Sequence, residues 1–417
     1  MANEGINILI IVDHMLPYTR AFGSCQRIYY LANYLSSKGC NVSVISEKRE
    51  KINRNLSNLE CRFKKYWVEN KTFFLQKYFQ KLSHIIFNDV GEKIAFENYK
   101  WSLECRKKIF EVISEQKIDI LIISGPPFSA FSLVKAVRKK DKNVKIILDY
   151  RDPWNLWENT WGMSRKLESR YISDCDRVVC FCDEFKTDME KFFPQKENSA
   201  KYDVVYNGYQ ENLWKNVESK YHANSKMIFE FIGSLEFRDN SMNFRNPFRL
   251  IDAFLDFSLD KDVELIFIGL TKLTAEMKEI SRKSGGKIKF FKAVSAQKSL
   301  ERMVEGDILI TINYLNSWAD RYALSGKLFD YLRSGRVIWG IGAKRGALRR
   351  FILENKVGVF CENNEEDIKK LLNCLYDKWS KEKHIERKND NRDWSIYSRE
   401  YQNEKYYQII KNLMDIR

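Results

Sequence analysis

The sequence predicts an α/β protein built from two doubly wound domains, each with a parallel sheet. Short apolar runs alternate with helix-length amphipathic segments, which is the pattern of βαβ units. The apolar runs are rich in Ile, Val and Leu, as in strands buried on both faces. The alternation extends over 417 residues and starts again near residue 227. A chain of this length is too long for one ordinary core, so two domains are expected.

The first series of predicted strands lies before residue 208. Its members are short and apolar: Ile6–Val12, Asn41–Ser46, Ile118–Ser124, Val144–Tyr150, Arg177–Cys182 and Tyr202–Asn207. Helices are expected between them, for example over Ser24–Lys38, which stops before Gly39. Another is expected over Phe128–Lys140, directly after two prolines.

A second series of strands follows a connection near residues 207–221. Its members are Met227–Gly233, Val263–Gly269, Lys287–Phe291, Asp307–Ile312, Arg336–Ile341 and Val357–Glu362. The predicted domains are therefore 1–208 and 222–395, and residues 396–417 are expected to form a helix that crosses back to the first domain. Ligands of such folds bind at the carboxyl ends of the strands, so we expect the domains to face each other across a cleft.

Composition limits the classes of function. With 44% hydrophobic residues the chain is expected to be globular, and no apolar run approaches the roughly 20 residues of a membrane span. The stretch "MANEGINILIIVD" is interpreted as a first strand and not as a signal peptide, which predicts a cytoplasmic protein. Nine cysteines without regular spacing predict reduced thiols. A net charge of +15 indicates an anionic partner.

The stretch "ALSGKLFDYLRSG" predicts a phosphate site at the start of a helix. Ser325, Gly326 and Lys327 would lie at the N-terminus, where free N–H groups and the helix dipole favour an anion. Asp330, one turn further, could accept hydrogen bonds from ribose hydroxyls. The alternative is that Gly326 is an ordinary loop glycine and Asp330 a favourable charge in the first turn.

Several other motifs fail on inspection. A Walker A loop would need glycine at Arg321 and Ser or Thr at Leu328. The stretch "GIGAKRG" is one residue too long for a dinucleotide fingerprint, so NAD binding is not expected. The "DCD" of Asp174–Asp176 resembles a metal-binding DxD but could equally cap a turn. Four dispersed histidines give no zinc site, and no G-x-S-x-G elbow is present. No metal site is predicted.

The order of the motifs resembles one family over nearly the whole chain. They are "ILIIVDHMLPYTRAFGSCQRIYYL" from Ile8, "LDYRDPW" at Leu148–Trp154, Asn207-Gly208, "FIGSLEFR" at Phe231–Arg238 and "SGKLFDYLRSGRVI" from Ser325. In this order and spacing they resemble the retaining GT-B glycosyltransferases of family 4. The resemblance implies the GT-B fold, with two Rossmann-like domains.

The resemblance also implies a reaction and a division of roles. A sugar would pass from a nucleotide diphosphate sugar to an acceptor hydroxyl with retention of configuration, without a metal or other cofactor. The N-terminal domain would bind the acceptor and the C-terminal domain the nucleotide sugar. The implied catalytic residues are Lys327, Arg238 and Asp152. The implied donor-binding residues are Gly233, Ser234, Ser325, Gly326, Lys327 and Asp330. The implied acceptor or cleft residues are His14, Gly23, Ser24, Arg151 and Trp154.

Two positions depart from the family pattern. Tyr322 stands where many relatives carry a glutamate, and Asp330 replaces a longer glutamate. The alternative to an enzyme is therefore a catalytically inactive two-lobed partner protein. Arg151 and Asp152 could also form a structural ion pair instead of orienting a substrate.

Basic and aromatic residues alternate between residues 48 and 87. This composition suits an anionic membrane surface, and family acceptors are often lipid-linked. We therefore expect a peripheral enzyme on the inner face of the cell membrane, active in bacterial cell-surface polysaccharide or glycan assembly. The alternatives are a solvated cover over the domain edge and a nucleic-acid surface. No nucleic-acid module is recognised, so no nucleic-acid partner is predicted.

Overall fold

The computed structural model describes residues 5–19, 22–50, 52–53, 59–69, 99–156, 162–195, 201–217, 225–235, 246–313, 318–387 and 392–415. The chain forms two compact units. Unit 1 comprises residues 1–207 and 400–417, and unit 2 comprises residues 208–399. Each unit is a parallel sheet covered by helices, which confirms the predicted fold class.

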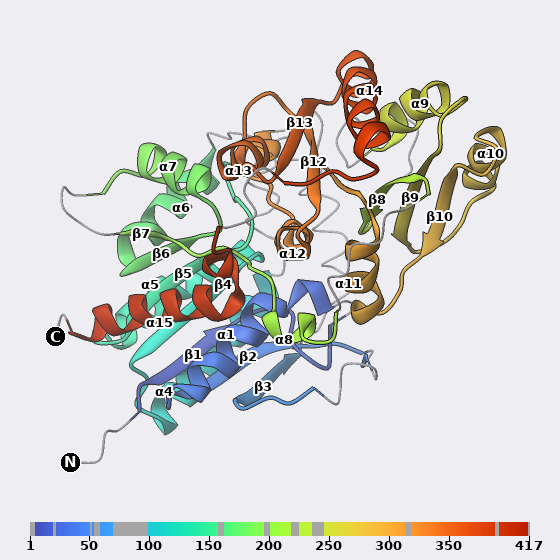
Figure 1. Ribbon diagram of the computed structural model, residues 1–417. Coiled ribbons are helices and arrows are strands. Elements are labelled where there is room, and N and C mark those ends of the chain that lie inside the picture. The colour runs from blue at the N-terminus through green and yellow to red at the C-terminus, as the bar shows by residue number, and fades with distance from the viewer. Residues whose placement is uncertain are drawn as a thin grey trace. The chain divides into compact units, whose positions relative to one another are not determined.

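Unit 1 contains a seven-stranded parallel sheet in the order β3-β2-β1-β4-β5-β6-β7 (Figure 1). Its strands are β1 (Asn7–Ile11), β2 (Asn41–Lys48), β3 (Lys64–Glu69), β4 (Ile120–Gly125), β5 (Lys145–Tyr150), β6 (Arg177–Cys180) and β7 (Tyr202–Val204). Its helices are η1 (Phe22–Ser24), α1 (Gln26–Ser37), α4 (Tyr99–Glu115), η3 (Phe128–Ser132), α5 (Leu133–Lys140), α6 (Met163–Asp174), α7 (Asp183–Phe192) and α15 (Arg399–Asp415).

The edge strand β3 was not predicted from the sequence. It lies inside the region expected to be a basic, membrane-facing insert, and it pairs in parallel with β2. Its charged and aromatic residues belong to a partly exposed edge strand, which lacks the continuous apolar run of a central strand. Lys48, the first residue of the predicted insert, is the exposed last residue of β2. Residues 70–98, which include the C-terminal part of the predicted insert from residue 70 to residue 87, lie outside the described residues.

The last helix of the chain completes the core of unit 1. Tyr406, Ile409 and Ile410 of α15 are buried in one apolar cluster with residues of β1 and α1. The Glu404 carboxylate accepts a hydrogen bond from the Tyr34 hydroxyl of α1. Lys38 forms an ion pair with the same carboxylate, at 2.9 Å. These contacts hold α15 against a helix that lies 370 residues earlier in the chain.

Unit 2 contains a six-stranded parallel sheet in the order β10-β9-β8-β11-β12-β13. Its strands are β8 (Met227–Ile232), β9 (Val263–Leu270), β10 (Ile288–Lys292), β11 (Ile308–Ile312), β12 (Val337–Gly342) and β13 (Gly358–Glu362). Its helices are α8 (Glu211–Trp214), α9 (Phe248–Phe257), α10 (Ala275–Lys283), α11 (Ala296–Glu305), η4 (Trp318–Arg321), α12 (Gly326–Ser334), α13 (Ala347–Asn355), α14 (Glu365–Glu382) and η5 (Ser395–Tyr397).

Each sheet reverses its strand order at one point, between β1 and β4 in unit 1 and between β8 and β11 in unit 2. Connections leave in opposite directions on the two sides of such a point, so a crevice opens beyond the carboxyl ends of those strands. Every strand predicted from the sequence is present, within about two residues at most ends. The fold therefore offers one place for a ligand in each unit.

The cysteines are all unpaired, and most of them are buried. This agrees with the prediction of reduced thiols. No helix of the described residues is both long enough and apolar enough to cross a membrane.

Candidate functional site

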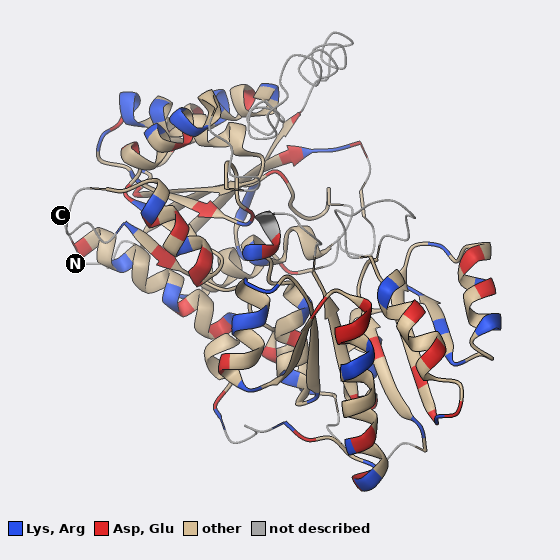
Figure 2. Ribbon diagram, turned by 90° about the horizontal axis from the view of Figure 1, so that it is seen from above, with Lys and Arg blue, Asp and Glu red and all other residues tan. Residues whose placement is uncertain are grey.

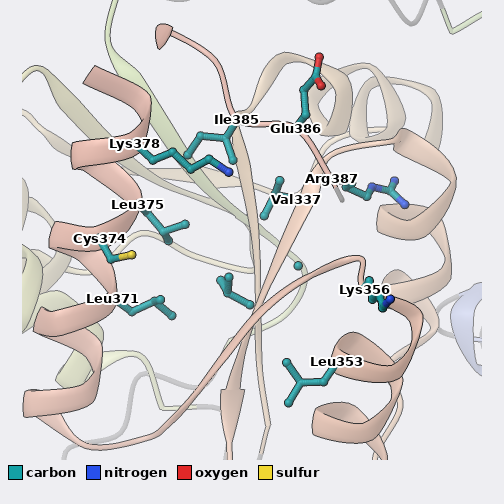
Figure 3. Close-up of a pocket in the computed structure, with 12 residues that line it drawn as sticks. Val337, Leu353, Lys356, Leu371, Cys374, Leu375, Lys378, Ile385, Glu386 and Arg387 are labelled. Carbon is teal, nitrogen blue, oxygen red and sulfur yellow. The ribbon is translucent and has the colours of Figure 1, made fainter. Parts of the chain in front are cut away.

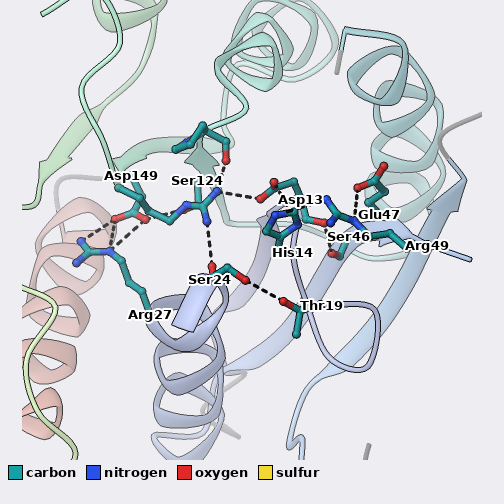
Figure 4. Close-up of polar contacts among 12 residues, drawn as sticks. Asp13, His14, Thr19, Ser24, Arg27, Ser46, Glu47, Arg49, Ser124 and Asp149 are labelled. Atoms are coloured by element: carbon teal, nitrogen blue, oxygen red, sulfur yellow. Dashed lines mark hydrogen bonds and ion pairs between the residues drawn. The ribbon is translucent and has the colours of Figure 1, made fainter. Parts of the chain in front are cut away.

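Polar side chains converge at the carboxyl ends of β1, β4 and β5 in unit 1 (Figure 4). Arg151, which follows β5, donates from Nη2 to Asp13 Oδ1 at 2.9 Å and to the Pro126 carbonyl oxygen. Its Nη1 donates to the Ser24 carbonyl oxygen at 3.1 Å. One guanidinium thus connects the ends of three strands with η1, and the predicted residues Arg151 and Ser24 lie together.

His14 belongs to the same cluster. Its Nδ1 lies 3.3 Å from Asp13 Oδ2, and its Nε2 lies 3.5 Å from Arg49 Nη2. Burial lowers the pKa of His14, Arg49 and Arg151 lower it further, and Asp13 opposes them. The imidazole is therefore expected to be neutral near pH 7, where it can exchange hydrogen bonds with a hydroxyl group.

The two predicted residues in the loop after β5, Asp152 and Trp154, differ in their exposure to solvent. Asp152 is exposed to solvent. Trp154 is only 1% exposed and stacks on Phe128, with ring centroids 5.4 Å apart and planes 3° apart. The structure therefore places Trp154 in the core of unit 1, where it anchors the loop instead of facing a ligand.

A buried ion pair beneath this cluster was not found by sequence reasoning. Arg27 Nη2 donates to Asp149 Oδ1 at 2.8 Å, and Arg27 Nη1 donates to the Val205 carbonyl oxygen at 2.9 Å. Ser124 donates to the second oxygen of Asp149 at 2.8 Å. The sequence feature that could have indicated this ion pair is Asp149, which lies inside the apolar run "VKIILDY". A charged residue in a buried strand requires a partner of opposite charge.

The donor residues predicted in unit 2 lie at its own switch point. Ser325 caps α12 by accepting a hydrogen bond from the Lys327 N–H at 3.3 Å. The α12 residue Tyr331 accepts a hydrogen bond from the Ile232 N–H at the end of β8, at 2.8 Å. Gly233 and Ser234 follow directly on β8, so the structure brings α12 to the strand end that carries them.

Lys327 already has partners within unit 2. Its Nζ donates to Ser299 Oγ at 3.1 Å and lies 3.9 Å from Asp330 Oδ2. Burial raises the pKa of Asp330, and the charges of Lys327 and Arg399 oppose that rise. Lys327, Ser325, Gly326 and Asp330 therefore form one group at the start of α12.

The region upstream of α12 contains a carboxylate that the sequence reasoning missed. Tyr322, one of the two departures from the expected family pattern, is fully buried. Asp320, two residues earlier, is 3% exposed and accepts a hydrogen bond from the Ala343 N–H at 2.7 Å. Burial raises the pKa of Asp320 to about 6. The burial of Asp320 near the end of η4 depends on how this loop packs. No local sequence motif indicates that packing.

Two remaining predictions concern Arg238 and metal binding. Arg238 lies outside the described residues. Asp176 of the "DCD" stretch accepts hydrogen bonds from the Ile146 N–H, at 2.6 Å, and from Arg138. These contacts agree with a turn-capping role. In the part of the chain that the structure describes, no group of three or more His, Cys, Asp or Glu residues could hold a metal ion.

A cavity of about 740 Å³ lies elsewhere in unit 2 (Figure 3). It opens beside Val337 and Gly358, at the amino ends of β12 and β13, and α14 contributes Leu371 and Leu375. None of the predicted site residues lines it. Because ligands of this fold bind at the carboxyl ends, the cavity is not part of the candidate site.

The space around Gly326 gives a direct test of the phosphate prediction. A Cβ atom built on this residue would meet no other atom within 4 Å. We therefore expect Gly326→Ala to leave the melting temperature within about 2 °C of the wild type, since a surface change costs at most about 0.5 kcal/mol. The same methyl group should weaken nucleotide binding about tenfold or more by keeping a phosphate from the amides.

Binding of Gly326→Ala would be measured by calorimetry with a nucleoside diphosphate. Gly23→Ala in unit 1, where a Cβ atom also has open space, is the comparison: as an expected acceptor-side change it should leave the affinity for a nucleoside diphosphate unchanged. Unchanged affinity in Gly326→Ala would remove the start of α12 from the donor site.

Comparisons with known proteins agree with this geometry. Residues 23–212 match the model of Glycosyltransferase Family 4. Curated proteins give no match. Sucrose-phosphate synthase from Thermosynechococcus elongatus aligns with a TM-score of 0.70 and 10% identity, over 99% of this chain and 100% of the other. The lipopolysaccharide outer core galactosyltransferase WaaB aligns with a TM-score of 0.58 and 14% identity, over 98% and 99%.

The same fold also occurs outside the transferases. A UDP-N-acetylglucosamine 2-epimerase, described as putative, from Listeria monocytogenes aligns with a TM-score of 0.58 and 14% identity, over 99% of this chain and 98% of the other. At these identities the solved structures establish the fold, and the family match covers residues 23–212, most of unit 1. The chain therefore has the GT-B fold of these solved structures, and its residues 23–212 resemble Glycosyltransferase Family 4.

Proposed function

We propose that this enzyme transfers a sugar from a nucleotide diphosphate sugar to an acceptor hydroxyl with retention of configuration. The observation that carries the proposal is the start of α12, where Ser325, Gly326 and Lys327 lie at the switch point of unit 2. A capped helix N-terminus with open space at its glycine can receive a diphosphate. Asp330, beside Lys327, would then hold the ribose hydroxyls.

The main chemical demand of this reaction is the departure of a diphosphate. Negative charge develops on it in the transition state, and fixed cations and N–H dipoles stabilise that charge. Lys327 supplies the cation, and Ser299 and Asp330 hold its Nζ in place. Arg238 remains the proposed second cation. No metal is required by this scheme.

Unit 1 would supply the acceptor side. Retention requires an acceptor hydroxyl held on the face that the diphosphate leaves, so orientation contributes more than a strong base. Arg151 is fixed by Asp13, Ser24 and Pro126, and His14 is expected to be a neutral hydrogen-bonding group. Together with the exposed Asp152 they form a polar surface suited to sugar hydroxyls.

The proposed biological setting is bacterial cell-surface polysaccharide or glycan assembly, with a lipid-linked acceptor. Similarity of fold to a lipopolysaccharide outer core galactosyltransferase supports this setting. Such an acceptor would require the cytoplasmic enzyme to attach peripherally to an anionic membrane, as expected from residues 48–87.

A groove in unit 1 adds support for membrane attachment. It has a volume of about 280 Å³, and its lining includes Arg106 of α4 together with Lys135 and Lys139 of α5. Tyr99 and Leu103 on its rim are 43% and 42% exposed. Lysine and arginine recur along these helices (Figure 2). Cations beside exposed apolar side chains suit the head-group region of an anionic membrane.

Transfer itself is tested by incubating the purified protein with UDP-, GDP-, dTDP- and ADP-sugars. A donor that binds the folded state raises the melting temperature, and this identifies the nucleotide. Anomeric NMR signals of the product with a lipid-linked acceptor extract then report retention or inversion. A sugar epimerised without any acceptor, or donor binding without turnover, would contradict the proposal and favour an epimerase or an inactive partner protein.

Membrane attachment is expected to depend on charge. The wild type should co-sediment with vesicles containing phosphatidylglycerol and lose most of this binding above about 0.5 M salt, where the screening length is only a few Å. A variant with Arg106, Lys135 and Lys139 changed to Gln should bind at least tenfold more weakly, because each cation contributes about 1 kcal/mol.

The control also removes three positive charges, by changing Lys272, Lys278 and Lys283 to Gln on α10 and the adjoining loop of unit 2. A third variant with Lys71, Lys77 and Lys81 changed to Gln tests the predicted insert separately. Equal binding by the groove variant and its control would show that the groove is only a solvated surface.

A further inference from the structure

A carboxylate buried behind the loop after β5 is not used by the proposed mechanism. Glu168 of α6 is 0% exposed. Its Oε1 accepts a hydrogen bond from the Tyr150 hydroxyl at 2.9 Å, at the last residue of β5. Its Oε2 accepts from the Asn155 side-chain amide at 2.7 Å and from the Asn155 backbone N–H at 3.3 Å. One side chain therefore joins α6, the strand end and the loop.

This contact fixes one end of the loop that carries Arg151 and Asp152. At the other end, the Arg151 N–H donates to the Gly125 carbonyl oxygen at 2.8 Å. Between the two ends, Trp154 is buried against Phe128. The loop from Arg151 to Asn155 is thus held at its start, its middle and its end, and only Asp152 is left facing solvent.

A core built only for stability would rarely place a carboxylate here. Burying a carboxylate costs several kcal/mol, and a well-packed apolar replacement is often as stable or more so. What a carboxylate supplies is two acceptor oxygens that can serve a strand end and a loop at once. Asn155 is itself ordered further, because its Oδ1 accepts a hydrogen bond from Ser164 Oγ at 2.5 Å.

We propose that Glu168 is a positioning residue, which holds Asp152 and Arg151 in the orientation that receives the acceptor. It acts through Asn155 and Tyr150 and touches no substrate. This inference rests on the proposed function, because it assigns Glu168 to the acceptor side of the same reaction.

The surroundings of Glu168 make its action depend on pH. Burial raises its pKa to about 7, opposed by its hydrogen bonds from Asn155 and Tyr150 and by the charge of Arg165 on its own helix. From β7 it is faced by Tyr202, whose own pKa is raised by burial. A protonated Glu168 has one acceptor position fewer, so one of its three donors loses a partner. The loop should therefore be held less firmly below about pH 7.

The test compares wild-type enzyme with Glu168→Gln and Glu168→Asp in the full chain. Glutamine keeps the shape without the charge, and the shorter aspartate keeps the charge. We expect Glu168→Gln to raise the acceptor KM or lower kcat about tenfold, to leave donor affinity unchanged, and to lose the acidic limb that the wild type shows near pH 7. Glu168→Asp should recover part of the activity and keep a limb. Glu190→Gln, an exposed change on α7, is the control.

Hydrogen exchange of the backbone amides of Asp152, Trp154 and Asn155 gives a second readout, which does not need turnover. We expect these amides to exchange at least tenfold faster in Glu168→Gln than in wild type, while those of α12 in unit 2 stay unchanged. Wild-type acceptor kinetics, pH profile and loop exchange in Glu168→Gln would overturn the positioning role and leave the proposed function standing. An inactive wild type would instead overturn both.

Discussion

Replacing Lys327 by methionine is expected to lower kcat for sugar transfer by about 10²-fold or more, the cost of removing one preorganised group that faces developing charge. The fold should survive, because Lys327 is partly exposed and its contacts are one hydrogen bond to Ser299 and one long ion pair to Asp330. The measurement is steady-state kinetics with a saturating donor, accompanied by thermal unfolding. Donor affinity should fall less than kcat, since the charge on the diphosphate grows as the bond breaks.

Lys298→Met provides the matched control. Lys298 lies next to Ser299 on α11, is half exposed and is paired with Glu301 at 3.1 Å. It has the same charge in the same neighbourhood but does not belong to the group at the start of α12. Equal loss of activity in both variants would indicate a general field effect, and wild-type turnover in Lys327→Met would end the diphosphate assignment.

Replacing Arg27 by methionine is expected to destabilise the protein by about 3–5 kcal/mol, the usual cost of leaving one member of a buried ion pair alone. Asp149 is 0% exposed and would lose its cation, and the Val205 carbonyl would lose a donor. The measurement is urea unfolding at neutral pH, followed by tryptophan fluorescence, because unit 1 buries Trp101 and Trp154.

Two further variants decide whether the loss comes from Asp149. The double variant Arg27→Met with Asp149→Asn should recover part of the stability, because the isolated charge is removed. Arg62→Met breaks an exposed pair with Glu60 and should cost no more than about 1 kcal/mol. If Arg27→Met and Arg62→Met cost the same, the Arg27–Asp149 pair does not stabilise unit 1 as described.

The central strands were predicted well from the sequence because a strand that is buried on both faces consists mostly of apolar residues. Runs such as those of β1, β4 and β5 must be apolar along their whole length, so their positions can be read without any tertiary information. β3 has no such apolar run. Among the described residues, one edge of β3 has no neighbouring strand. The Lys, Tyr and Trp residues of β3 are equally compatible with a strand and with an exposed cover.

The candidate site was predictable to the extent that it is local. The start of α12 could be found because cap, glycine and lysine are adjacent in the sequence. The contacts of Arg151 with Asp13 and Ser24 could not, because they depend on how β1, β4 and β5 align in the sheet. Trp154 was expected at a cleft because the stretch "LDYRDPW" resembles a family motif. The aromatic pocket that η3 and α6 form around Trp154 cannot be deduced from the spacing of residues in the sequence.

The return of α15 to unit 1 has a consequence for biosynthesis. A ribosome delivers the first 207 residues long before it delivers Tyr406 and Ile410, which fill the space against β1 and α1. Residues 208–399 are made in between, which takes roughly 10–40 s at about 5–20 residues per second. During that interval the nascent first sheet exposes an apolar surface that α15 covers in the folded chain. The second unit, whose residues are continuous, can finish folding first, so the chain is expected to complete its folding in the reverse of its order of synthesis.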